Sequence, residues 1–460
     1  MKRFVTFLLA LTLVCSLCAC GGSGDEAKTP EGLQIGYSKI NITPDFEVGI
    51  NGYADAETRR STGGLMTYIF MTCIAATDGD ETILLYTYDN INCSHEFAET
   101  LRGVISPATG IAKEKIFIGA THSHSAPSTD EVKYKELVLK AAVEAAQEAL
   151  SDRSPATIQA ATHTIEGMNF VRHVVMEDGT IAGSNFGNWE LKPVGMQSEP
   201  DDQMVLVKFD RGADKKAVLM VNWQAHPDWA RAIGYNSLAA SWIGPFRDEL
   251  EKLCGMNVAY FTGASGNLNP NSTVASLDHG LNWKEYGIKL GQLANEALPN
   301  LKTIEGTGIA TTGEMFPVDI DHSWDHMLSQ ANEVYELWKS VGKAEGDALG
   351  KTYGFTSSYQ ARDIRTRAQM GPTIDLELNA FRIGGVGFAT TTNEMFCQQG
   401  KFIKEKDPFE ITFIIAGNDR YLACAEAFDY RSYEADTGLY AKGSAEKVGD
   451  ELVRLMNTLK

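Results

Sequence analysis

The sequence predicts an α/β protein, with mixed β-sheets and flanking helices in a single large domain. Two observations predict this class. Short apolar runs alternate along the chain with longer segments in which apolar residues recur at helical spacing. No internal repeat and no long low-complexity segment is visible after residue 32, so residues 33–460 are expected to form one compact unit.

Six runs are predicted to be buried strands because they are short, almost continuously apolar and mostly rich in β-branched or aromatic residues. "TILLYTYD" and "ITFIIAGND" are typical of them. In chain order they cover residues 82–89, 115–122, 204–210, 217–226, 386–394 and 411–419.

Five segments are predicted to be amphipathic helices, because their apolar residues return every three or four positions and form one face. "KELVLKAAVEAAQEAL" is an example. The five cover residues 135–150, 243–254, 284–298, 326–340 and 445–459.

The N-terminus has the pattern of a bacterial lipoprotein signal. Lys2 and Arg3 precede a short apolar run, and small residues then lead to Cys20. Residues 1–19 are expected to be removed, Cys20 to carry a lipid, and residues 20–32 to form a flexible tether. An ordinary signal peptide or a membrane span is the alternative, although the apolar run is short for a span. We therefore expect an extracytoplasmic lipoprotein, at the bacterial cell surface or in the periplasm.

Charge and cysteine content argue against two classes of protein, those that bind nucleic acids and those held together by disulfides. The formal net charge is −19 and no basic cluster follows the first three residues, which argues against nucleic-acid partners. The cysteines after Cys20 are odd in number and scattered, which argues against a disulfide framework.

Polar residues follow several of the predicted strands. His122, His226, Glu394 and Tyr421 each lie where an apolar run ends or just beyond it. In α/β sheets, ligands bind in the crevice beyond one set of strand ends. We therefore expect these ends to converge on one pocket.

Two imidazoles, a carboxylate and a phenolate form a ligand set that suits zinc. In "THSH", His122 and His124 are two apart, so in extended backbone they point to the same side. One can bind metal while the other acts as an acid, a base or an oxyanion donor. The alternatives stay open: histidines that simply meet water or carbonyls, a Glu394 that caps the following helix, and tyrosines that are packing residues.

A serine nucleophile is not expected. The stretch "GASGN" places Asn267 at the fifth position of the G-x-S-x-G motif, so the motif fails at Ser265.

Together these segments resemble the catalytic domain of the neutral/alkaline, non-lysosomal ceramidases, a family of zinc amidases that cleave N-acylsphingosines. The resemblance runs from about residue 36 to the C-terminal region. It rests on the order of "NITPDFEVGINGYA", "IFIGATHSHSAP", "MNFVRH", "VNWQAHP", "GASGNLNPN", "TTNEMF" and "RYLACAEAFDYRSYE".

The resemblance implies a zinc site and a set of catalytic groups. The implied zinc ligands are His122, His226, Glu394 and Tyr421. His124, Arg172 and Tyr433 would surround the scissile carbonyl during attack by zinc-bound hydroxide, and Gly52 and Asn269 would contact the substrate.

The sequence also departs from the family. Asn267 and Asn269 replace an aspartate and a serine of its Gly-Asp-Val-Ser-Pro-Asn element, and Ser241 replaces another aspartate. The expected function is zinc-dependent hydrolysis of a linear amide in a lipid-like or other N-acyl substrate. The alternative is an inactive ligand-binding or ester-cleaving lipoprotein on the same fold.

Overall fold

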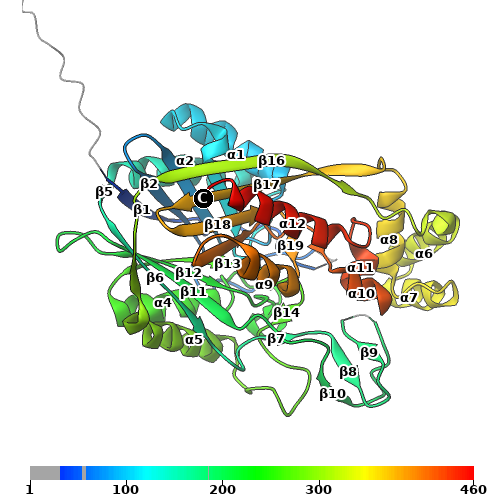
Figure 1. Ribbon diagram of the computed structural model, residues 1–460. Helices are drawn as coiled ribbons and strands as arrows, with labels where there is room; N and C mark the ends of the chain where they lie inside the picture. The colour runs from blue at the N-terminus through cyan, green and yellow to red at the C-terminus, as the bar shows by residue number, and fades with distance from the viewer. Residues whose placement is uncertain (1–31, 54–57, 185) are drawn as a thin grey trace, which may run out of the picture.

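Three β-sheets with the same strand order form the frame of the molecule (Figure 1). The structure is a computed structural model that describes residues 32–53, 58–184 and 186–460. The predicted signal peptide, Cys20 and the tether up to residue 31 lie outside the described residues.

The first sheet has the order β4-β3-β2-β1, with the short β5 added beside β1. β1, β2 and β3 are antiparallel, whereas β3 and β4 are parallel and α1 connects them. α2 follows β4. The bounds of this first unit are β1 Gln34–Asn41, β2 Phe70–Thr77, β3 Thr82–Tyr88, α1 His95–Thr109, β4 Ile116–Ala120, α2 Val132–Ser151 and β5 Ser154–Pro155.

The second sheet repeats this plan in the order β13-β12-β11-β6, with β15 added beside β6. β12 and β13 are parallel and α4 lies between them in the chain. The bounds of the second unit are β6 Thr157–Thr164, β11 Gln203–Asp210, β12 Val218–Trp223, α4 Ile243–Cys254, β13 Asn257–Thr262, α5 Trp283–Ala297 and β15 Lys302–Ile304.

The third sheet has the order β20-β18-β17-β16. Its parallel pair, β18 and β20, is connected through α9, and α12 follows β20. The bounds of the third unit are β16 Ile309–Asp319, β17 Thr373–Ile383, β18 Val386–Thr391, α9 Cys397–Lys406, β20 Ile411–Ala416 and α12 Ser444–Asn457.

Each sheet packs its outer face against its own helix pair: α1 with α2, α4 with α5, and α9 with α12. Side chains alternate along the strands, so Leu84 and Tyr86 of β3 face the helices while Ile83 and Leu85 face inward. Burial on both faces explains why these strands are almost continuously apolar.

The inner faces of all three sheets meet in one central core. Phenylalanine rings join the units there: Phe117 of β4 stacks on Phe381 of β17 with centroids 4.3 Å apart, and Phe261 of β13 meets Phe413 of β20 at 5.5 Å. The edge strands β4, β13 and β20 contact one another pairwise. Their carboxyl ends are therefore brought to a common place.

A long connection joins the first two strands of each unit. Residues 42–69 connect β1 to β2, residues 165–202 connect β6 to β11, and residues 320–372 connect β16 to β17. The second connection carries β7 Phe170–Val171, β8 Val174–Met176, β9 Ile181–Ala182 and β10 Pro193–Met196; the third carries α6 Leu328–Ser340, α7 Lys343–Thr352 and α8 Ser358–Arg367. Both extend toward the same end of the molecule, at the right of Figure 1.

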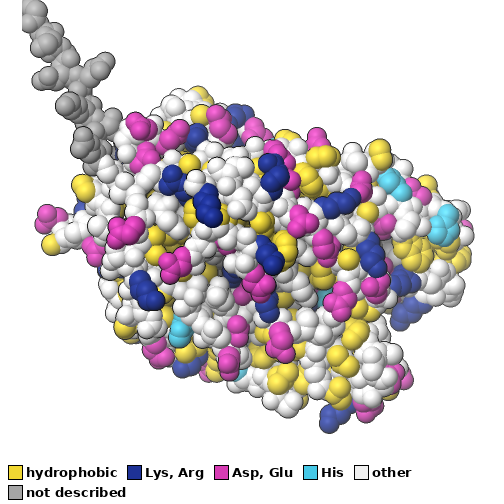
Figure 2. Space-filling view, in the orientation of Figure 1, with side chains coloured by type: hydrophobic (Ala, Val, Ile, Leu, Met, Phe, Trp, Pro, Cys, Tyr) yellow, Lys and Arg dark blue, Asp and Glu magenta, His cyan; other side chains and the backbone are white. Residues whose placement is uncertain are grey.

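In addition to three short 3-10 helices, the described part of the chain has smaller elements between those of the three units. They are α3 Ala230–Ile233, β14 Leu268–Asn269, β19 Glu394–Met395, β21 Tyr421–Leu422, α10 Ala425–Asp429 and α11 Tyr433–Thr437. On the face in Figure 2, acidic and basic side chains are interspersed, with apolar side chains scattered among them. Within the described ranges, none of the helices has the length and apolar character to cross a membrane.

The predicted class, an α/β fold with mixed sheets and flanking helices, is confirmed. Strands or helices occupy all eleven predicted segments, although several predicted strands are too long at their carboxyl ends. The run 217–226, for example, ends as a strand at Trp223, so His226 lies in the following loop.

Candidate metal centre

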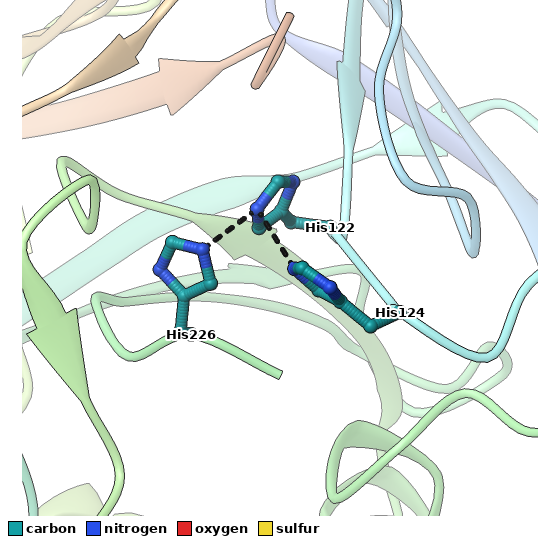
Figure 3. A group of neighbouring side chains, drawn as sticks. All are labelled: His122, His124 and His226. Carbon is teal, nitrogen blue, oxygen red and sulfur yellow. Dashed lines mark hydrogen bonds between the residues drawn. The ribbon is translucent and has the colours of Figure 1, made fainter. Parts of the chain in front are cut away.

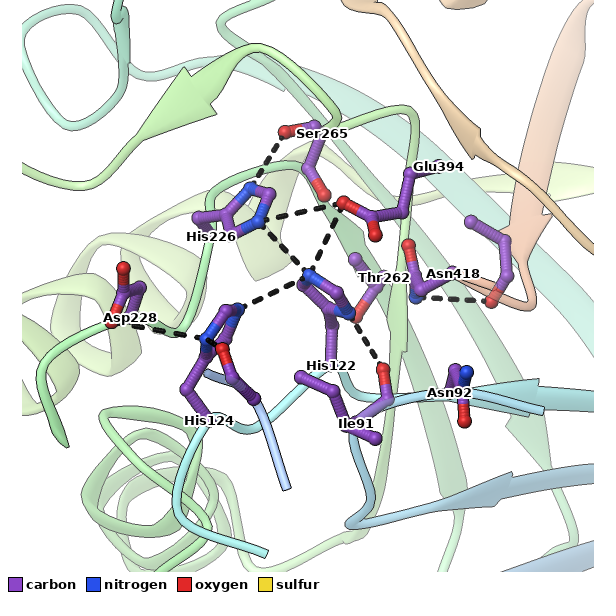
Figure 4. Close-up of polar contacts among 12 residues, drawn as sticks. Ile91, Asn92, His122, His124, His226, Asp228, Thr262, Ser265, Glu394 and Asn418 are labelled. Atoms are coloured by element: carbon purple, nitrogen blue, oxygen red, sulfur yellow. Dashed lines mark hydrogen bonds and ion pairs between the residues drawn. The ribbon is translucent and has the colours of Figure 1, made fainter. Parts of the chain in front are cut away.

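Each unit contributes one side chain to a buried cluster at the strand ends (Figures 3 and 4). His122 follows β4, His226 follows β12, and Glu394 begins β19 just beyond β18. The Nε2 atoms of His122 and His226 are 2.9 Å apart, and Glu394 Oε2 lies 3.3 Å from the first and 3.6 Å from the second. A second histidine of the first unit joins them, because His124 Nε2 is 3.3 Å from His122 Nε2.

Backbone carbonyls fix the tautomer of all three imidazoles. The Nδ1 atom of His122 lies 2.6 Å from the Ile91 oxygen, that of His124 2.8 Å from the Gly52 oxygen, and that of His226 3.1 Å from the Ser265 oxygen. A carbonyl oxygen only accepts, so each Nδ1 must carry the proton and donate it. In a neutral ring, Nε2 then presents a lone pair to the cluster.

The cluster therefore fits a cation. Three nitrogen lone pairs and a carboxylate oxygen that point at one another repel unless a positive charge lies between them. Glu394 Oε2 is buried and has no hydrogen-bond partner among the residues that the structure describes. His122, His124 and His226 each offer one ring nitrogen as a donor, and these three atoms all lie within 4.8 Å of one another. Nitrogen and oxygen donors with carbonyl-bound second nitrogens are typical of zinc sites.

Burial and charge shift the protonation of the histidines in different directions. Burial lowers the pKa of His124 to about 4 and that of His226 well below its ordinary value. For His122, burial also acts to lower the pKa, but the Glu394 carboxylate outweighs it and raises that pKa above the ordinary value.

The backbone at His122 differs from the expectation. His122 has φ 67°, in the left-handed region, so "THSH" is not the extended segment expected from its sequence. The two imidazoles nevertheless converge, with centroids 4.9 Å apart and planes at 89°. Glu394 is not the helix cap considered above, because the Asn267 side-chain oxygen accepts from the Cys397 amide at the start of α9.

The first long connection surrounds His124. The Gly52 carbonyl accepts from its Nδ1, and the ring of Tyr53 meets the imidazole edge-on at 5.4 Å. The Tyr53 hydroxyl in turn donates to Asp228, whose carboxylate oxygen is 3.9 Å from His124 Nδ1. The contact made by Gly52 is through its carbonyl; the predicted contact of its amide with substrate stays a prediction.

A second group of predicted residues lies beside Glu394. Glu394 and Tyr421 are paired in register in the parallel strands β19 and β21, which places their side chains on the same face of the pair. The Arg172 guanidinium lies 5.2 Å from the Tyr421 ring centroid, and the rings of Tyr421 and Tyr433 are 5.9 Å apart. Tyr421 as a ligand, and Arg172 and Tyr433 as catalytic groups, stay predictions.

Asn269 holds the segment that carries Arg172. It lies in β14, which pairs with Phe170 and Val171 of β7, and the neighbouring Asn267 carbonyl accepts from the Arg172 amide at 3.0 Å. The side chain of Asn267 is buried and bonds to Gln398. Asn267 thus has a structural role, and contact of Asn269 with substrate stays a prediction.

A buried ion-pair network went unnoticed in the sequence. Glu434 accepts from Arg172 Nε at 2.6 Å and from His173 Nε2 at 2.8 Å, and His173 Nδ1 is 2.9 Å from the Tyr430 hydroxyl. Two signals were present: His173 is adjacent to Arg172, and Glu434 is adjacent to Tyr433.

All three long connections reach this region. The first brings Gly52 and Tyr53 to His124, the second brings Arg172 and His173 to Glu434, and the third brings Tyr359 to within 6.0 Å of the Tyr433 ring. The strand ends thus hold the candidate metal ligands, while the connections supply residues that surround them.

Comparison with known proteins agrees with this architecture at the level of the fold. No protein-family model matches the sequence, and no curated protein matches it. Among solved structures, a ceramidase complexed with C2 superposes with a TM-score of 0.69 and 13% identity, over 94% of this chain and 76% of that one. The chain has the neutral ceramidase fold. The neutral ceramidase of Pseudomonas aeruginosa gives a TM-score of 0.68 at 13% identity, over 94% of this chain and 75% of that chain. The neutral ceramidase fold therefore spans nearly the whole described chain, as the sequence resemblance predicts.

Proposed function

We propose that the protein is a zinc-dependent amidohydrolase that cleaves the linear amide of a lipid-like or other N-acyl substrate. The observation that carries this proposal is the buried set of His122, His226 and Glu394 at the strand ends of a neutral ceramidase fold. Its buried carboxylate oxygen, which lacks a hydrogen bond, and its inward nitrogen donors suit a divalent cation. Structural similarity to a ceramidase complexed with C2 supports an acyl substrate of this kind.

His122, His226 and Glu394 would hold the metal, with Tyr421 as the fourth ligand. Zinc, when bound, polarises a carbonyl and lowers the pKa of water toward about 7. The Arg172 guanidinium and the Tyr433 hydroxyl are donors suited to negative charge developing on the carbonyl oxygen. His124, with its Nδ1 proton held by Gly52, has an Nε2 lone pair that can take a proton from water and pass it to the leaving amine.

Purified protein tests the proposal in two steps. Elemental analysis should find about one zinc per chain. A panel of fluorogenic amides with sphingoid, amino-acid and amino-sugar leaving groups should show turnover that a chelator blocks and added zinc restores. A metal-loaded protein that turns over none of them, but binds one, would favour the ligand-binding lipoprotein. Turnover restricted to esters would contradict the amidase assignment.

We further propose that the mature chain is attached to the membrane through a lipid on Cys20, which would bring the domain close to lipid-like substrates. Labelled fatty acid should be incorporated into the wild-type protein and not into Cys20→Ala. Equal incorporation into both proteins would contradict this anchor.

A further inference from the structure

Glu434 is placed beside the candidate catalytic groups but is not one of them. It follows Tyr433 in the first turn of α11, and its side chain is 0% exposed. Both carboxylate oxygens are used: Oε1 accepts from Arg172, and Oε2 accepts from His173. The carboxylate therefore holds Arg172 from one side while His173, backed by Tyr430, holds the carboxylate from the other.

The Arg172 guanidinium depends on this partner. Its side chain is 8% exposed, and both Nε and Nη2 approach Glu434 Oε1, at 2.6 and 2.5 Å. Burial acts to raise the pKa of Glu434, but Arg172 and His173 outweigh it and hold that pKa at about 2. The pair is thus an ionised, charge-neutral unit at any pH near neutrality.

Charge neutrality has a consequence for what the site binds. A free guanidinium next to a divalent cation is a strong receptor for carboxylates, since it offers a planar pair of N–H donors as well as charge. Hydrolysis of an N-acyl compound releases a carboxylate. An unpaired Arg172 would therefore favour the product over the uncharged substrate carbonyl.

Resting on the function proposed above, we infer that Glu434 is a positioning residue that orients Arg172 and cancels its charge. The site then accepts an uncharged acyl carbonyl in preference to a carboxylate. Glu434 makes no contact with the reacting atoms in this scheme; it acts through Arg172.

The variant Glu434→Gln tests this because it keeps the shape and an acceptor oxygen but removes the charge. Octanoate binding to the zinc-loaded full-length protein, followed by calorimetry, should tighten by about tenfold or more, which corresponds to at least about 1.4 kcal/mol. With a neutral fluorogenic amide, kcat should fall about tenfold or more while KM changes little. Glu434→Asp restores the charge at a shorter reach, so octanoate affinity should return toward wild type while kcat stays reduced.

Glu426→Gln is the matched control. Glu426 is a neighbouring carboxylate on α10 that accepts from Gln197 at an exposed position, so its loss should change neither octanoate affinity nor kcat. Unchanged octanoate affinity in a folded Glu434→Gln protein would overturn the inference. If that variant does not fold, His173→Asn should shift octanoate affinity in the same direction by a smaller factor; no shift there would also overturn it.

The binding measurement needs no turnover, so the two proposals fail separately. A wild-type protein that loads zinc and shows the predicted octanoate differences, yet hydrolyses no amide, would contradict the amidase function and leave the role of Glu434 standing.

Discussion

At the scale of single residues, three backbone carbonyls decide what the histidines can bind. Ile91, Gly52 and Ser265 accept from Nδ1 of His122, His124 and His226, so each ring turns the same nitrogen, Nε2, toward Glu394 or toward another ring. Carbonyl partners of this kind orient the ligands of metal sites and raise their basicity. The same arrangement suits His124 both as a ligand and as a proton carrier, and substitution separates the two roles.

Removing one imidazole at a time distinguishes ligand from acid or base. His226→Ala should reduce bound zinc from about one per chain to a small fraction, because it removes a donor that lies 2.9 Å from His122. His124→Ala should keep its zinc and lose about a hundredfold to ten-thousandfold in rate. Elemental analysis and amide turnover are the measurements, with the half-buried His163→Ala of β6 as the control. Loss of zinc in His124→Ala would make His124 a ligand instead.

Gly52 is the residue whose backbone holds His124. Its φ is +112°, and a Cβ atom built there would lie 2.8 Å from His124 Cα. Gly52→Ala should therefore cost about 1–3 kcal/mol in the free energy of unfolding and at least about tenfold in rate.

Chemical denaturation and amide turnover check the Gly52 prediction. Gly64→Ala is the control, because Gly64 has φ +85° with nothing within 4 Å of the added carbon. The Gly64→Ala variant should therefore show only the loss of stability that backbone strain causes. Equal activity in the two variants would mean that close packing against His124 does not matter for the reaction.

At the scale of elements, the apolar pattern of the sequence predicts six buried strands but misses two others that are also buried, β2 and β13, and misses strands whose residues are largely exposed. β18 and β20 are short runs of mostly small, apolar and β-branched residues, and every one of these residues is buried. β16, "IATTGEMFPVD", is an edge strand in which most residues are partly or fully exposed, so no apolar run marks it. β17 alternates polar and apolar residues and lies between β16 and β18, a pairing that its own sequence does not indicate.

The repeated strand order of the three units could not be predicted from the sequence either. The three units share strand order, direction and helix placement, yet no internal repeat is visible in their residues. Strand pairing is carried by backbone hydrogen bonds, which any apolar β-forming residues can satisfy. Topology can therefore repeat where side chains do not.

An ion pair connects the helix layer of the first unit to the sheet of the third. Arg102 of α1 contacts both carboxylate oxygens of Glu377 on β17, at 2.7 and 2.9 Å, and the two side chains are 7% and 12% exposed. His95 lies 2.8 Å from the same carboxylate, and Glu99 shares Arg102. Burial acts to raise the pKa of Glu377, but Arg102 outweighs it and lowers that pKa to about 2.

The sign of the pH dependence follows from this lowered pKa. Glu377 binds its proton more weakly in the folded protein than in the unfolded chain, so its stabilisation is complete above the ordinary range near pH 4.5 and is lost as pH falls toward about 2. Glu377→Gln should cost on the order of 1–3 kcal/mol at pH 7, and much less near pH 2.5. Urea unfolding at the two pH values measures the difference. A cost that is independent of pH would show that packing, not charge, stabilises this contact.

At the scale of the whole molecule, the site could be placed from the sequence but not completed. His122, His226 and Glu394 could be selected from the sequence because each follows an apolar run, and the end of such a run can be recognised from neighbouring residues alone. Glu434, His173 and Asp228 gave no such signal, since their roles depend on partners as distant as the 262 positions between Arg172 and Glu434. Long-range pairing of this kind is set by the packing of the three units.

The metal site should also stabilise the assembled molecule. Its candidate donors come from three units that meet only in the folded state, so zinc would bind the folded chain and not the unfolded one. Saturating zinc should therefore add about 4 kcal/mol at a free concentration about a thousand times Kd, and chelation should lower Tm. Calorimetric scans with and without chelator test this, with His226→Ala as the control that should no longer respond. An unchanged Tm after confirmed loss of zinc would contradict it.

The three long connections and the strand ends divide between them two properties that enzymes often have to change together, namely the contacts with substrate and the binding of the metal. Each connection joins the first two strands of its unit, whereas His122, His226 and Glu394 follow later strands. A lineage could therefore lengthen or trim the parts of a connection that lie away from Gly52 and Arg172 and so meet a new leaving group, while the strand ends that carry the candidate metal donors stay in place.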